Sequence, residues 1–348
     1  MNIIQVCPRY YPDIGGVETH VKEISERLVQ RGHQVEVVCT DPSGMYPKRE
    51  RIHGVQVTRF RSFAPGDAYY IAPGIFFYLK NCDAPVLHAH GYHAFPALFA
   101  ALAADRKKFM FTPHYHGHGH TWFRNFLLTL YTVIGKRIFY RADKIICDSE
   151  YERTLVAKKF PVQEEKFVLI PIGINFHEFS GFTANRDPHR LLYIGRIEEY
   201  KGVQHIIEAL PALPEYSLVI VGKGPYETDL RSLASSLDVE NRITWKKDLS
   251  REDLIREYLS AGIFISLSSF EAFGITVAEA LASGLQVIVS TEGALAEFID
   301  NEMCIGIEPA SKRLEDAIRS LGAPSVYKKK IYDWDEVIDK IIRTYSGE

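Results

Sequence analysis

The sequence predicts an α/β protein with two doubly wound domains that face each other across a central cleft. Its length of 348 residues exceeds the ~150 residues of a typical domain and favours two domains. Short apolar runs alternate with segments of helical periodicity, as in a parallel sheet covered by helices. Residues 175–190 lose this periodicity and contain Asn, Gly, Asp and Pro, so we place the domain linker there.

The first domain is expected over residues 1–175. It opens with an apolar strand at Asn2–Cys7, a loop through Gly15 and Gly16, and an amphipathic helix that ends at Gly32. Ser149, followed three residues later by Glu152, predicts a capping box that opens a helix at Tyr151–Lys159. Further strands are expected at Gln34–Cys39, Val86–His88, Lys108–Phe111, Lys144–Cys147 and Val168–Ile170.

The second domain is expected over residues 176–325, and residues 326–348 contain a closing helix at Trp334–Tyr345. Ligands of doubly wound domains bind beyond the carboxyl ends of the strands, so the cleft is the expected site. The predicted strands of this domain are Leu191–Ile194, Leu218–Val221, Ile243–Trp245, Ile263–Leu267 and Gln286–Val289.

The composition is that of an ordinary soluble protein, with 46% hydrophobic residues, 24% charged residues and a net charge of −3. The sequence contains no run of ~18 apolar residues and no pattern typical of a signal peptide at its start. Its five cysteines are scattered and form no CxxC motif, which is typical of free thiols in a reducing compartment. We therefore expect a cytoplasmic protein without a nucleic-acid partner.

The segment Trp122–Tyr140 combines aromatic and basic residues in a predicted helix. Such a helix could lie on the inner face of an anionic membrane as a peripheral contact. It could equally pack against the core of its own domain, and the sequence leaves both interpretations open.

Two glutamates separated by seven residues follow the predicted strand Ile263–Leu267. Between them, Gly274 starts a helix whose first amides and dipole suit an anion such as a diphosphate. Glu271 precedes the helix and could accept hydrogen bonds from sugar hydroxyls. Glu279 lies more than one turn inside the helix, where it could bind the vicinal hydroxyls of a ribose. Taken alone, either glutamate could instead be a solvated surface residue.

A second group of charged residues follows the predicted strand Leu191–Ile194. Gly195 and Arg196 come directly after it, and Lys201 follows within the same loop. An arginine fork and a lysine ammonium could converge on one dianionic group and neutralise it without a metal. An ordinary charged surface loop is the alternative.

Glycines and histidines supply the remaining candidates. Gly15 and Gly16 would let the backbone approach a ligand closely, although no GxGxxG motif is present and the pair could simply form a turn. Gly222 and Gly224 are better explained by a turn. The alternating histidines lack a matching Cys or carboxylate spacing, so we expect no metal site. These histidines are His114, His116, His118 and His120.

Taken in order, these segments resemble the group 1 glycosyltransferases, also called glycosyltransferase family 4. The resemblance covers nearly the whole chain and is carried by PRYYPDIGGVETH, FTPHYHG, LLYIGRIEEYKG, FEAFGITVAEALASG and DWDEVIDKIIRTY. It implies the GT-B fold, in which two Rossmann-like domains face a cleft and the last helix crosses back to the first, acceptor-side domain.

The resemblance also implies an activity: retaining transfer of a hexose, of the glucose or mannose type, to a carbohydrate or lipid-linked acceptor. The donor would be a nucleotide-diphosphate sugar, and no cofactor or metal would be required. Two alternatives remain open at this point. One is a nucleotide-sugar epimerase on the same fold, and the other is a non-catalytic GT-B-like binding subunit.

Residue roles are implied by matching motifs. Arg196 and Lys201 would hold the diphosphate, assisted by the amides of Gly274 and Ile275. Glu279 would bind the ribose and Glu271 the donor sugar. The remaining assigned residues are Gly15, Gly16 and Gly195 at the nucleotide and His114 beside the transferred sugar.

Overall fold

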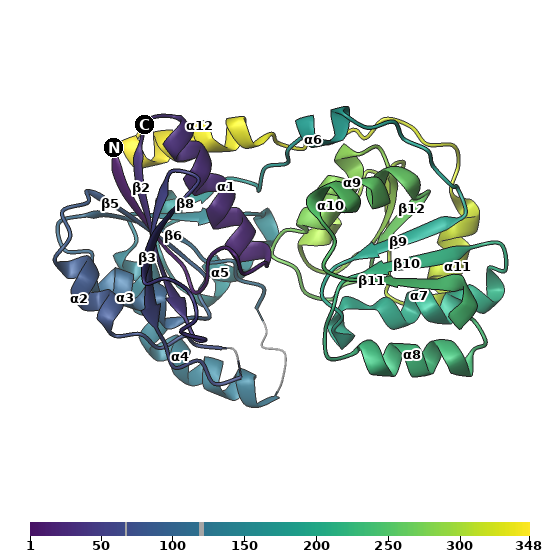
Figure 1. Cartoon of the computed structure of the whole chain (residues 1–348), viewed down its shortest axis with the longest axis horizontal. Coiled ribbons are helices and arrows are strands. Elements are labelled where there is room, and N and C mark those ends of the chain that lie inside the picture. The colour runs from purple at the N-terminus through teal and green to yellow at the C-terminus, as the bar shows by residue number, and fades with distance from the viewer. Residues whose placement is uncertain (67, 118–121) are drawn as a thin grey trace. The chain divides into compact units, whose positions relative to one another are not determined.

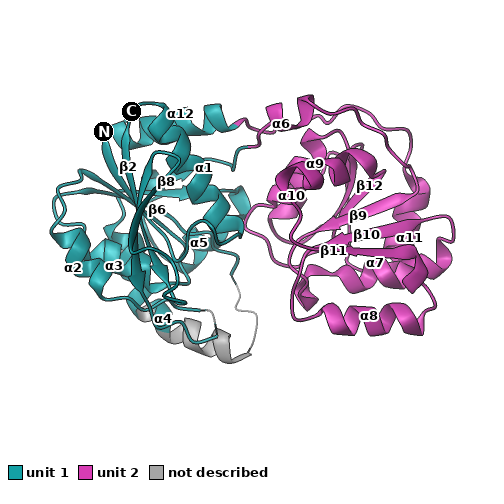
Figure 2. Ribbon diagram, in the orientation of Figure 1, with its two compact units in different colours: residues 1–173, 334–348 teal, residues 174–333 magenta. Residues whose placement is uncertain are grey.

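The computed structural model describes the backbone of residues 1–66, 68–117 and 122–348, and the side chains of these residues except 122–130 and 133. The chain forms two compact units, which are coloured separately in Figure 2. Unit 1 contains Met1–Gly173 and Trp334–Glu348, and unit 2 contains Ile174–Asp333.

The unit boundaries differ slightly from those expected, because the segment before Trp334 is attached to unit 2. The amide of Ile174 donates to the carbonyl oxygen of Tyr332 at 2.8 Å, and Ile174 forms an isolated parallel bridge with Asp333. Residues 326–333 therefore belong to unit 2 rather than to a unit of their own with the last helix.

Unit 1 contains an eight-stranded sheet in the order β3-β4-β2-β1-β5-β6-β7-β8. Neighbouring strands are parallel except β3 and β4, which are antiparallel. The strands are β1 Asn2–Val6, β2 Gln34–Asp41, β3 Arg49–Ile52, β4 Val55–Arg61, β5 Val86–His90, β6 Lys108–Thr112, β7 Lys144–Cys147 and β8 Phe167–Leu169. The helices, drawn in Figure 1, are α1 Gly16–Gln30, α2 Gly74–Lys80, α3 Phe95–Ala103, α4 Trp122–Arg141, α5 Glu150–Lys159, the 3₁₀ helix η1 Glu164–Lys166 and α12 Trp334–Ser346.

Unit 2 contains a six-stranded parallel sheet in the order β11-β10-β9-β12-β13-β14. The strands are β9 Arg190–Ile194, β10 Ser217–Val221, β11 Ile243–Lys246, β12 Ile263–Ser266, β13 Gln286–Ser290 and β14 Cys304–Ile307. The helices are α6 His177–Ser180, η2 Glu199–Lys201, α7 Val203–Ala209, η3 Leu210–Ala212, α8 Glu227–Ser236, η4 Glu240–Arg242, α9 Arg251–Ser260, α10 Ile275–Ala282, η5 Gly293–Phe298 and α11 Ser311–Ser320.

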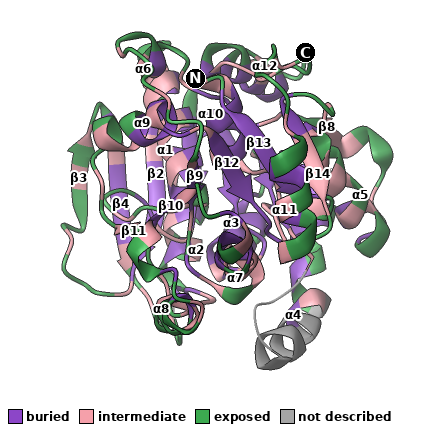
Figure 3. Ribbon diagram, turned by 90° about the vertical axis from the view of Figure 1, so that its right-hand side faces the viewer, coloured by how far each residue is buried: buried purple, intermediate pink, exposed green. Residues whose placement is uncertain are grey.

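Both sheets are doubly wound, which confirms the predicted fold class. In unit 2 the strand order, counted along the chain, is 3-2-1-4-5-6, so the order reverses between β9 and β12. In unit 1 the same reversal lies between β1 and β5. Every residue of β5, β12 and β13 is buried, and β12 and β13 appear in the colour of buried residues in Figure 3. Ligands of doubly wound sheets bind beyond the carboxyl ends of the strands at such a reversal, so each sheet has one expected binding position.

The predicted capping box at α5 forms only in part. Ser149 Oγ accepts the Glu152 amide at 3.0 Å, as expected. The Glu152 carboxylate, however, accepts the amides of Asp148 at 2.7 Å and of Tyr115 at 2.5 Å. Because Glu152 is fully buried, it acts as a link between the loops that follow β6 and β7.

In the part of the chain that the structure describes, no helix is both long and apolar enough to cross a membrane. The membrane-contact hypothesis depends on α4, where the side chains of 122–130 and 133 lie outside the described residues. Of the side chains that are described, Phe139 is fully buried in the core of unit 1. The expected positions His118 and His120 also lie outside the described residues.

Gly202 provides a test of how the loop before α7 is held. Its φ is +73°, and a Cβ there would lie 2.4 Å from the carbonyl oxygen of Leu267. Gly202→Ala should therefore destabilise unit 2 by ~1–3 kcal/mol or more. We expect scanning calorimetry to show its unfolding transition several degrees lower, because ~1 kcal/mol shifts Tm by about 2–4 °C in a domain of this size.

Gly181→Ala is the matched control for this experiment. Gly181 has φ −83° and a Cβ there would meet no atom within 4 Å. Its substitution should leave the transition within about 1 °C of wild type. Equal shifts for the two variants would contradict the strained approach of Gly202 to Leu267.

Candidate active site

The predicted site residues of unit 2 lie at the reversal point of its sheet. Gly195 and Arg196 directly follow β9, and the loop that follows β12 contains Glu271 and leads through Gly274 into α10. Because β9 and β12 are parallel neighbours, their carboxyl ends lie at the same edge of the sheet.

A salt bridge joins the two loops at this edge. Lys201 Nζ donates to Glu271 Oε1 at 2.5 Å, and the side chains are only 13% and 24% exposed. Burial by itself would lower the pKa of Lys201, but the Glu271 carboxylate more than offsets this and raises it above the ordinary value. Lys201 is therefore a permanent cation, already fixed beside a carboxylate.

Tyr200 connects Arg196 with this pair, which the sequence did not predict. Its hydroxyl accepts a hydrogen bond from Arg196 Nη2 at 2.7 Å, and its ring centroid lies 5.1 Å from Lys201 Nζ. The Tyr200 carbonyl oxygen accepts the Ser269 amide at 2.9 Å. Arg196, which also pairs with Glu198, is 61% exposed. The structure thus brings Arg196 and Lys201 together around one ring, with the guanidinium on the solvent side.

Glycines in the next loop hold the backbone that carries Arg196. A Cβ at Gly222 would lie 1.8 Å from the Gly195 carbonyl oxygen, and one at Gly224 would lie 2.1 Å from that of Ile197. The Ile197 amide donates to the Lys223 carbonyl oxygen at 3.0 Å. The pair predicted to form a plain turn therefore supports the Arg196 loop directly.

Gly274 lies at the N-cap of α10 with φ +110°, and a Cβ there would lie 2.5 Å from Leu295 Cδ2. Its carbonyl oxygen accepts the amides of Val277 and Ala278 at 3.1 Å. The amides that precede these, including that of Ile275, have no partner within the helix, as at any helix start. They form a positive helix end that begins a few residues after Glu271 along the chain.

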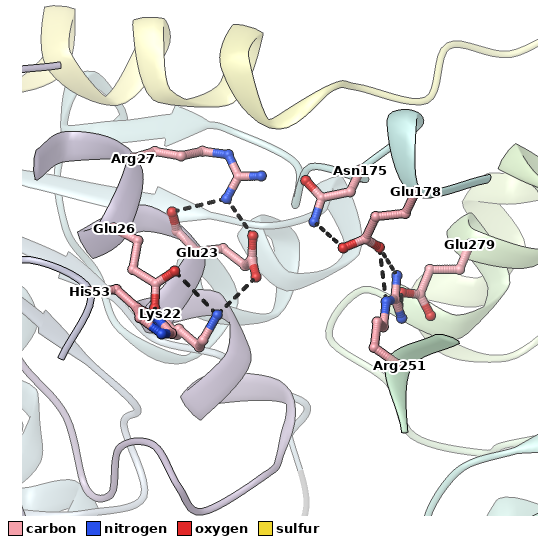
Figure 4. A network of polar contacts seen from close by, with 9 residues as sticks. All are labelled: Lys22, Glu23, Glu26, Arg27, His53, Asn175, Glu178, Arg251 and Glu279. Carbon is pink, nitrogen blue, oxygen red and sulfur yellow. Dashed lines mark hydrogen bonds and ion pairs between the residues drawn. The ribbon is translucent and has the colours of Figure 1, made fainter. Parts of the chain in front are cut away.

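Glu279 is buried rather than solvated, and two unpredicted residues of α9 bind it. Its Oε1 lies 2.7 Å from Arg251 Nη1, and its Oε2 accepts the Tyr258 hydroxyl at 2.8 Å. Arg251 also donates to Glu178 Oε2 from Nε at 2.8 Å and from Nη2 at 2.6 Å. Figure 4 shows how Arg251 lies between the two carboxylates.

These contacts orient Glu279 before any ligand arrives. Burial would lower the pKa of Arg251, but the carboxylates of Glu279 and Glu178 raise it above its usual range. Burial, together with the Glu279 carboxylate, raises the pKa of Tyr258, which keeps its hydroxyl protonated as a donor. Each carboxylate oxygen has two lone pairs, so Glu279 retains capacity for further donors.

In unit 1, Gly15 and Gly16 follow β1 and begin α1. A Cβ at Gly15 would lie 2.3 Å from Glu18 Oε2, so this position is crowded by the first-turn glutamate. A Cβ at Gly16 would meet no atom within 4 Å. Only Gly16 therefore has the open surroundings that a close approach to a ligand requires. The neighbouring α1 pairs among Lys22, Glu23, Glu26, Arg27 and His53, also drawn in Figure 4, are ordinary local salt bridges.

His114 lies just beyond β6 in a strained conformation, with φ +48°. Its Nδ1 is 2.7 Å from Asp148 Oδ2, and its side chain is 10% exposed. Asp148 is fully buried after β7. A carboxylate partner at Nδ1 fixes the tautomer in which Nδ1 carries the proton, so Nε2 presents a lone pair.

The structure groups His114 with two histidines that were not predicted to join it. His20 of α1 and His90 of β5 have ring centroids 5.0 and 5.7 Å from that of His114. The three rings place one nitrogen each within 4.8 Å of one another. From the alternating histidines His114 to His120 of the sequence, we expected no metal site. The cluster instead combines His114 with histidines from two other segments.

Arg251 provides a test of the Glu279 arrangement. Replacing it with Met leaves a carboxylate that is 9% exposed without its cation, so we expect a loss of ~2–4 kcal/mol after allowing for the 40% exposure of Arg251. Urea unfolding measures this loss. Arg256→Met is the control, because Arg256 lies on the same helix and is 57% exposed with exposed partners. Equal stability of the two variants would contradict the role of Arg251.

Comparisons with known proteins agree with the geometry. The model of Glycosyltransferase Family 4 matches residues 14–178, and the model of Glycosyl transferases group 1 matches residues 177–328. The two matches fall on unit 1 and on unit 2 almost completely.

Named relatives are glycosyltransferases. The GDP-mannose:cellobiosyl-diphosphopolyprenol alpha-mannosyltransferase of Xanthomonas campestris is 25% identical over 100% of this chain and 97% of its own. The phosphatidylinositol N-acetylglucosaminyltransferase GPI3 subunit of Saccharomyces cerevisiae is 24% identical over 99% of this chain and 83% of its own.

Solved structures share the fold. Sucrose-phosphate synthase from Thermosynechococcus elongatus superposes with a TM-score of 0.80 and 19% identity, over 100% of this chain and 99% of its own. The HepE protein of Anabaena, crystallised with UDP, gives a TM-score of 0.79 and 17% identity over 100% of both chains. These two likenesses support the two-unit GT-B fold. With the family matches and the named relatives, they show that this chain belongs to the group 1 glycosyltransferases and is a glycosyltransferase.

Proposed function

We propose that this glycosyltransferase transfers a hexose, of the glucose or mannose type, from a nucleotide-diphosphate sugar with retention of anomeric configuration. The observation that carries the proposal is the Lys201–Glu271 pair at the start of α10. It joins a fixed cation and a carboxylate at the sheet edge where α10 begins with its free amides, and these are the groups that a sugar diphosphate requires.

The diphosphate would be bound by unit 2 without a metal. Lys201 would supply a point charge and Arg196 a bidentate fork, while the Gly274 and Ile275 amides would donate to phosphate oxygens. Since negative charge grows on the diphosphate as the sugar departs, groups fixed in advance stabilise the transition state more than the ground state. Gly195 contributes by its lack of a side chain, because a Cβ there would lie 2.9 Å from the Tyr193 hydroxyl.

The carboxylates would bind hydroxyl groups. One oxygen of Glu271 is occupied by Lys201, which leaves the other for a hydroxyl of the donor sugar. Glu279, held by Arg251 and Tyr258, would accept hydrogen bonds from the ribose. We assign Gly16 of unit 1, which has open surroundings, to the phosphate, with Gly15 as the preceding N-cap residue of α1, and His114 to the transferred sugar.

In the proposed reaction the acceptor hydroxyl attacks the anomeric carbon from the face that the diphosphate leaves. The new carbon–oxygen bond forms as the bond to the diphosphate breaks, and the hydroxyl proton passes to a diphosphate oxygen. This route retains the anomeric configuration and needs no protein nucleophile. Exclusion of water during the step would suppress hydrolysis of the donor.

The relatives support an acceptor that is a carbohydrate or is linked to a lipid. One is named for transfer of mannose to a cellobiosyl-diphosphopolyprenol, and another for transfer of N-acetylglucosamine to phosphatidylinositol. Because such acceptors reside in membranes, we extend the proposal to peripheral contact with a membrane surface. GDP-mannose is therefore the first donor to test, and UDP-glucose and UDP-N-acetylglucosamine follow.

Lys201→Ala should weaken binding of the nucleoside diphosphate. Loss of one charge-assisted contact corresponds to ~1.5–3 kcal/mol, or about 10- to 100-fold in Kd, measurable by titration calorimetry with GDP and UDP. Lys201→Arg should recover part of the affinity. Lys223→Ala is the matched control, since Lys223 follows β10 and forms an exposed pair with Asp248. Unchanged affinity in Lys201→Ala would remove the phosphate contact from the proposal.

The stereochemistry is tested separately. We expect the first sugar released from the donor, by slow transfer to water or by transfer to an acceptor, to have the donor's anomeric configuration. Proton NMR during the first turnovers distinguishes the anomers before they equilibrate. An inverted first product would contradict retention while leaving the nucleotide site intact.

A further inference from the structure

We propose that His20, His90 and His114 form a binding site in unit 1 for one divalent transition-metal ion of the zinc type. The three residues come from α1, β5 and the loop after β6, which meet at the reversal point of the sheet. One ring nitrogen from each lies within 4.8 Å of the others. No motif in the sequence predicts this group.

The hydrogen bonds of His90 and His114 leave lone pairs available to a metal. His90 Nε2 lies 2.8 Å from Gln5 Oε1, so the proton is on Nε2 and Nδ1 is an acceptor. His114 has the opposite arrangement, because Asp148 binds Nδ1 and leaves Nε2 as the acceptor. Partners of this kind on the distal nitrogen orient imidazole ligands in metal sites.

The nitrogens left over are buried and unsatisfied. Among the described residues, His20 Nδ1, His90 Nδ1 and His114 Nε2 have no hydrogen-bond partner. His88, the fourth ring nearby, is already satisfied by Tyr345 and Thr112 at 2.7 and 2.8 Å. A single water molecule donates only two hydrogen bonds, whereas one cation can accept the lone pairs of all three rings. The cluster therefore fits a cation better than it fits solvent.

The charges around the cluster favour a cation. Asp148 is fully buried, its Oδ1 has no hydrogen-bond partner, and no Lys or Arg forms an ion pair with it in the described part of the chain. A divalent ion would supply the positive charge that this carboxylate region lacks.

The types of ligand atom indicate which metal ions the site would bind. Three imidazoles and no thiolate suit Zn²⁺, Co²⁺ or Ni²⁺ better than Mg²⁺ or Ca²⁺, which prefer oxygen ligands. Nitrogens on one tetrahedral zinc lie ~3.3 Å apart, given Zn–N of about 2.0–2.1 Å, so nitrogens that now lie within 4.8 Å of one another would have to move closer by up to ~1.5 Å on binding.

Metal binding has a consequence that rests on the proposed function. An ion bound to His114 Nε2 would fix the ring of the residue assigned to the transferred sugar, so it would inhibit transfer. Binding itself does not depend on that assignment. The test therefore measures binding of the metal ion. A negative result would contradict the metal site without contradicting the proposed transferase activity.

The experiment is a Co²⁺ titration of the full-length, tag-free protein. Visible absorption reports a tetrahedral site, and calorimetry gives the stoichiometry. We expect one ion per chain, and at least tenfold weaker binding in His90→Gln and in His20→Phe. Circular dichroism and thermal unfolding identify a variant that fails to fold, and two variants from separate elements make the result independent of either one.

His33→Gln is the control, because His33 Nδ1 lies 2.9 Å from the N-terminal nitrogen and could form an adventitious chelate with it. This variant should bind Co²⁺ as wild type does. The proposal is overturned by absence of a one-to-one site in wild type, by undiminished binding in folded His90→Gln, or by loss of binding in His33→Gln.

Discussion

The site in unit 2 depends on one interaction, the partly buried ion pair between Lys201 and Glu271. An ammonium and a carboxylate removed from water lose hydration, and such a pair persists only where its geometry is held by the surroundings. Here β9 and β12 supply that support, because their carboxyl ends are adjacent in the sheet. The Tyr200 carbonyl oxygen accepts a hydrogen bond from the Ser269 amide, which links the two loops. A ligand that brings its own negative charge can share the Lys201 ammonium without any new cation having to be buried.

In both units the candidate residues lie where the strand order of the sheet reverses, but their chemistry differs. In each sheet the strand order reverses once, and the residues at that point come from segments far apart in the sequence. Unit 2 places charged side chains and a helix start there. Unit 1 places three imidazole rings next to a buried carboxylate. The first arrangement suits an anion and the second a cation, so the two positions are not interchangeable.

Much of the fold could be predicted from the sequence because buried parallel strands are continuous apolar runs. Each predicted strand is present, with its ends within two residues of those expected. The missed strands, β3, β4 and β14, carry weaker signals. β3 reads RERI at the sheet edge with no buried residue, β4 contains the buried polar residues Thr58 and Arg59, and β14 is interrupted by Gly306. These strands therefore lack the continuous apolar run by which the others were predicted.

The candidate site could be predicted from the sequence only where its residues lie in loops that follow predicted strands. The positions around Arg196 and Glu271 follow strands directly, so their proximity follows from the parallel sheet. Arg251 and Tyr258 were missed because their role depends on how α9 faces α10. Their seven-residue spacing, which puts both on one helix face, was the available signal. His20 and His90 had no such signal, since only the folded sheet brings α1, β5 and the loop after β6 together.

The central claim is that a nucleoside diphosphate binds to the cations and helix-start amides at the reversal point of unit 2. A crystal structure of the protein with GDP or UDP tests it most directly. The account predicts phosphate oxygens within hydrogen-bond distance of Lys201 Nζ and of the amides at the start of α10, with the ribose at Glu279. A nucleotide bound elsewhere, with the Lys201–Glu271 pair undisturbed and its crevice filled by water, would contradict it.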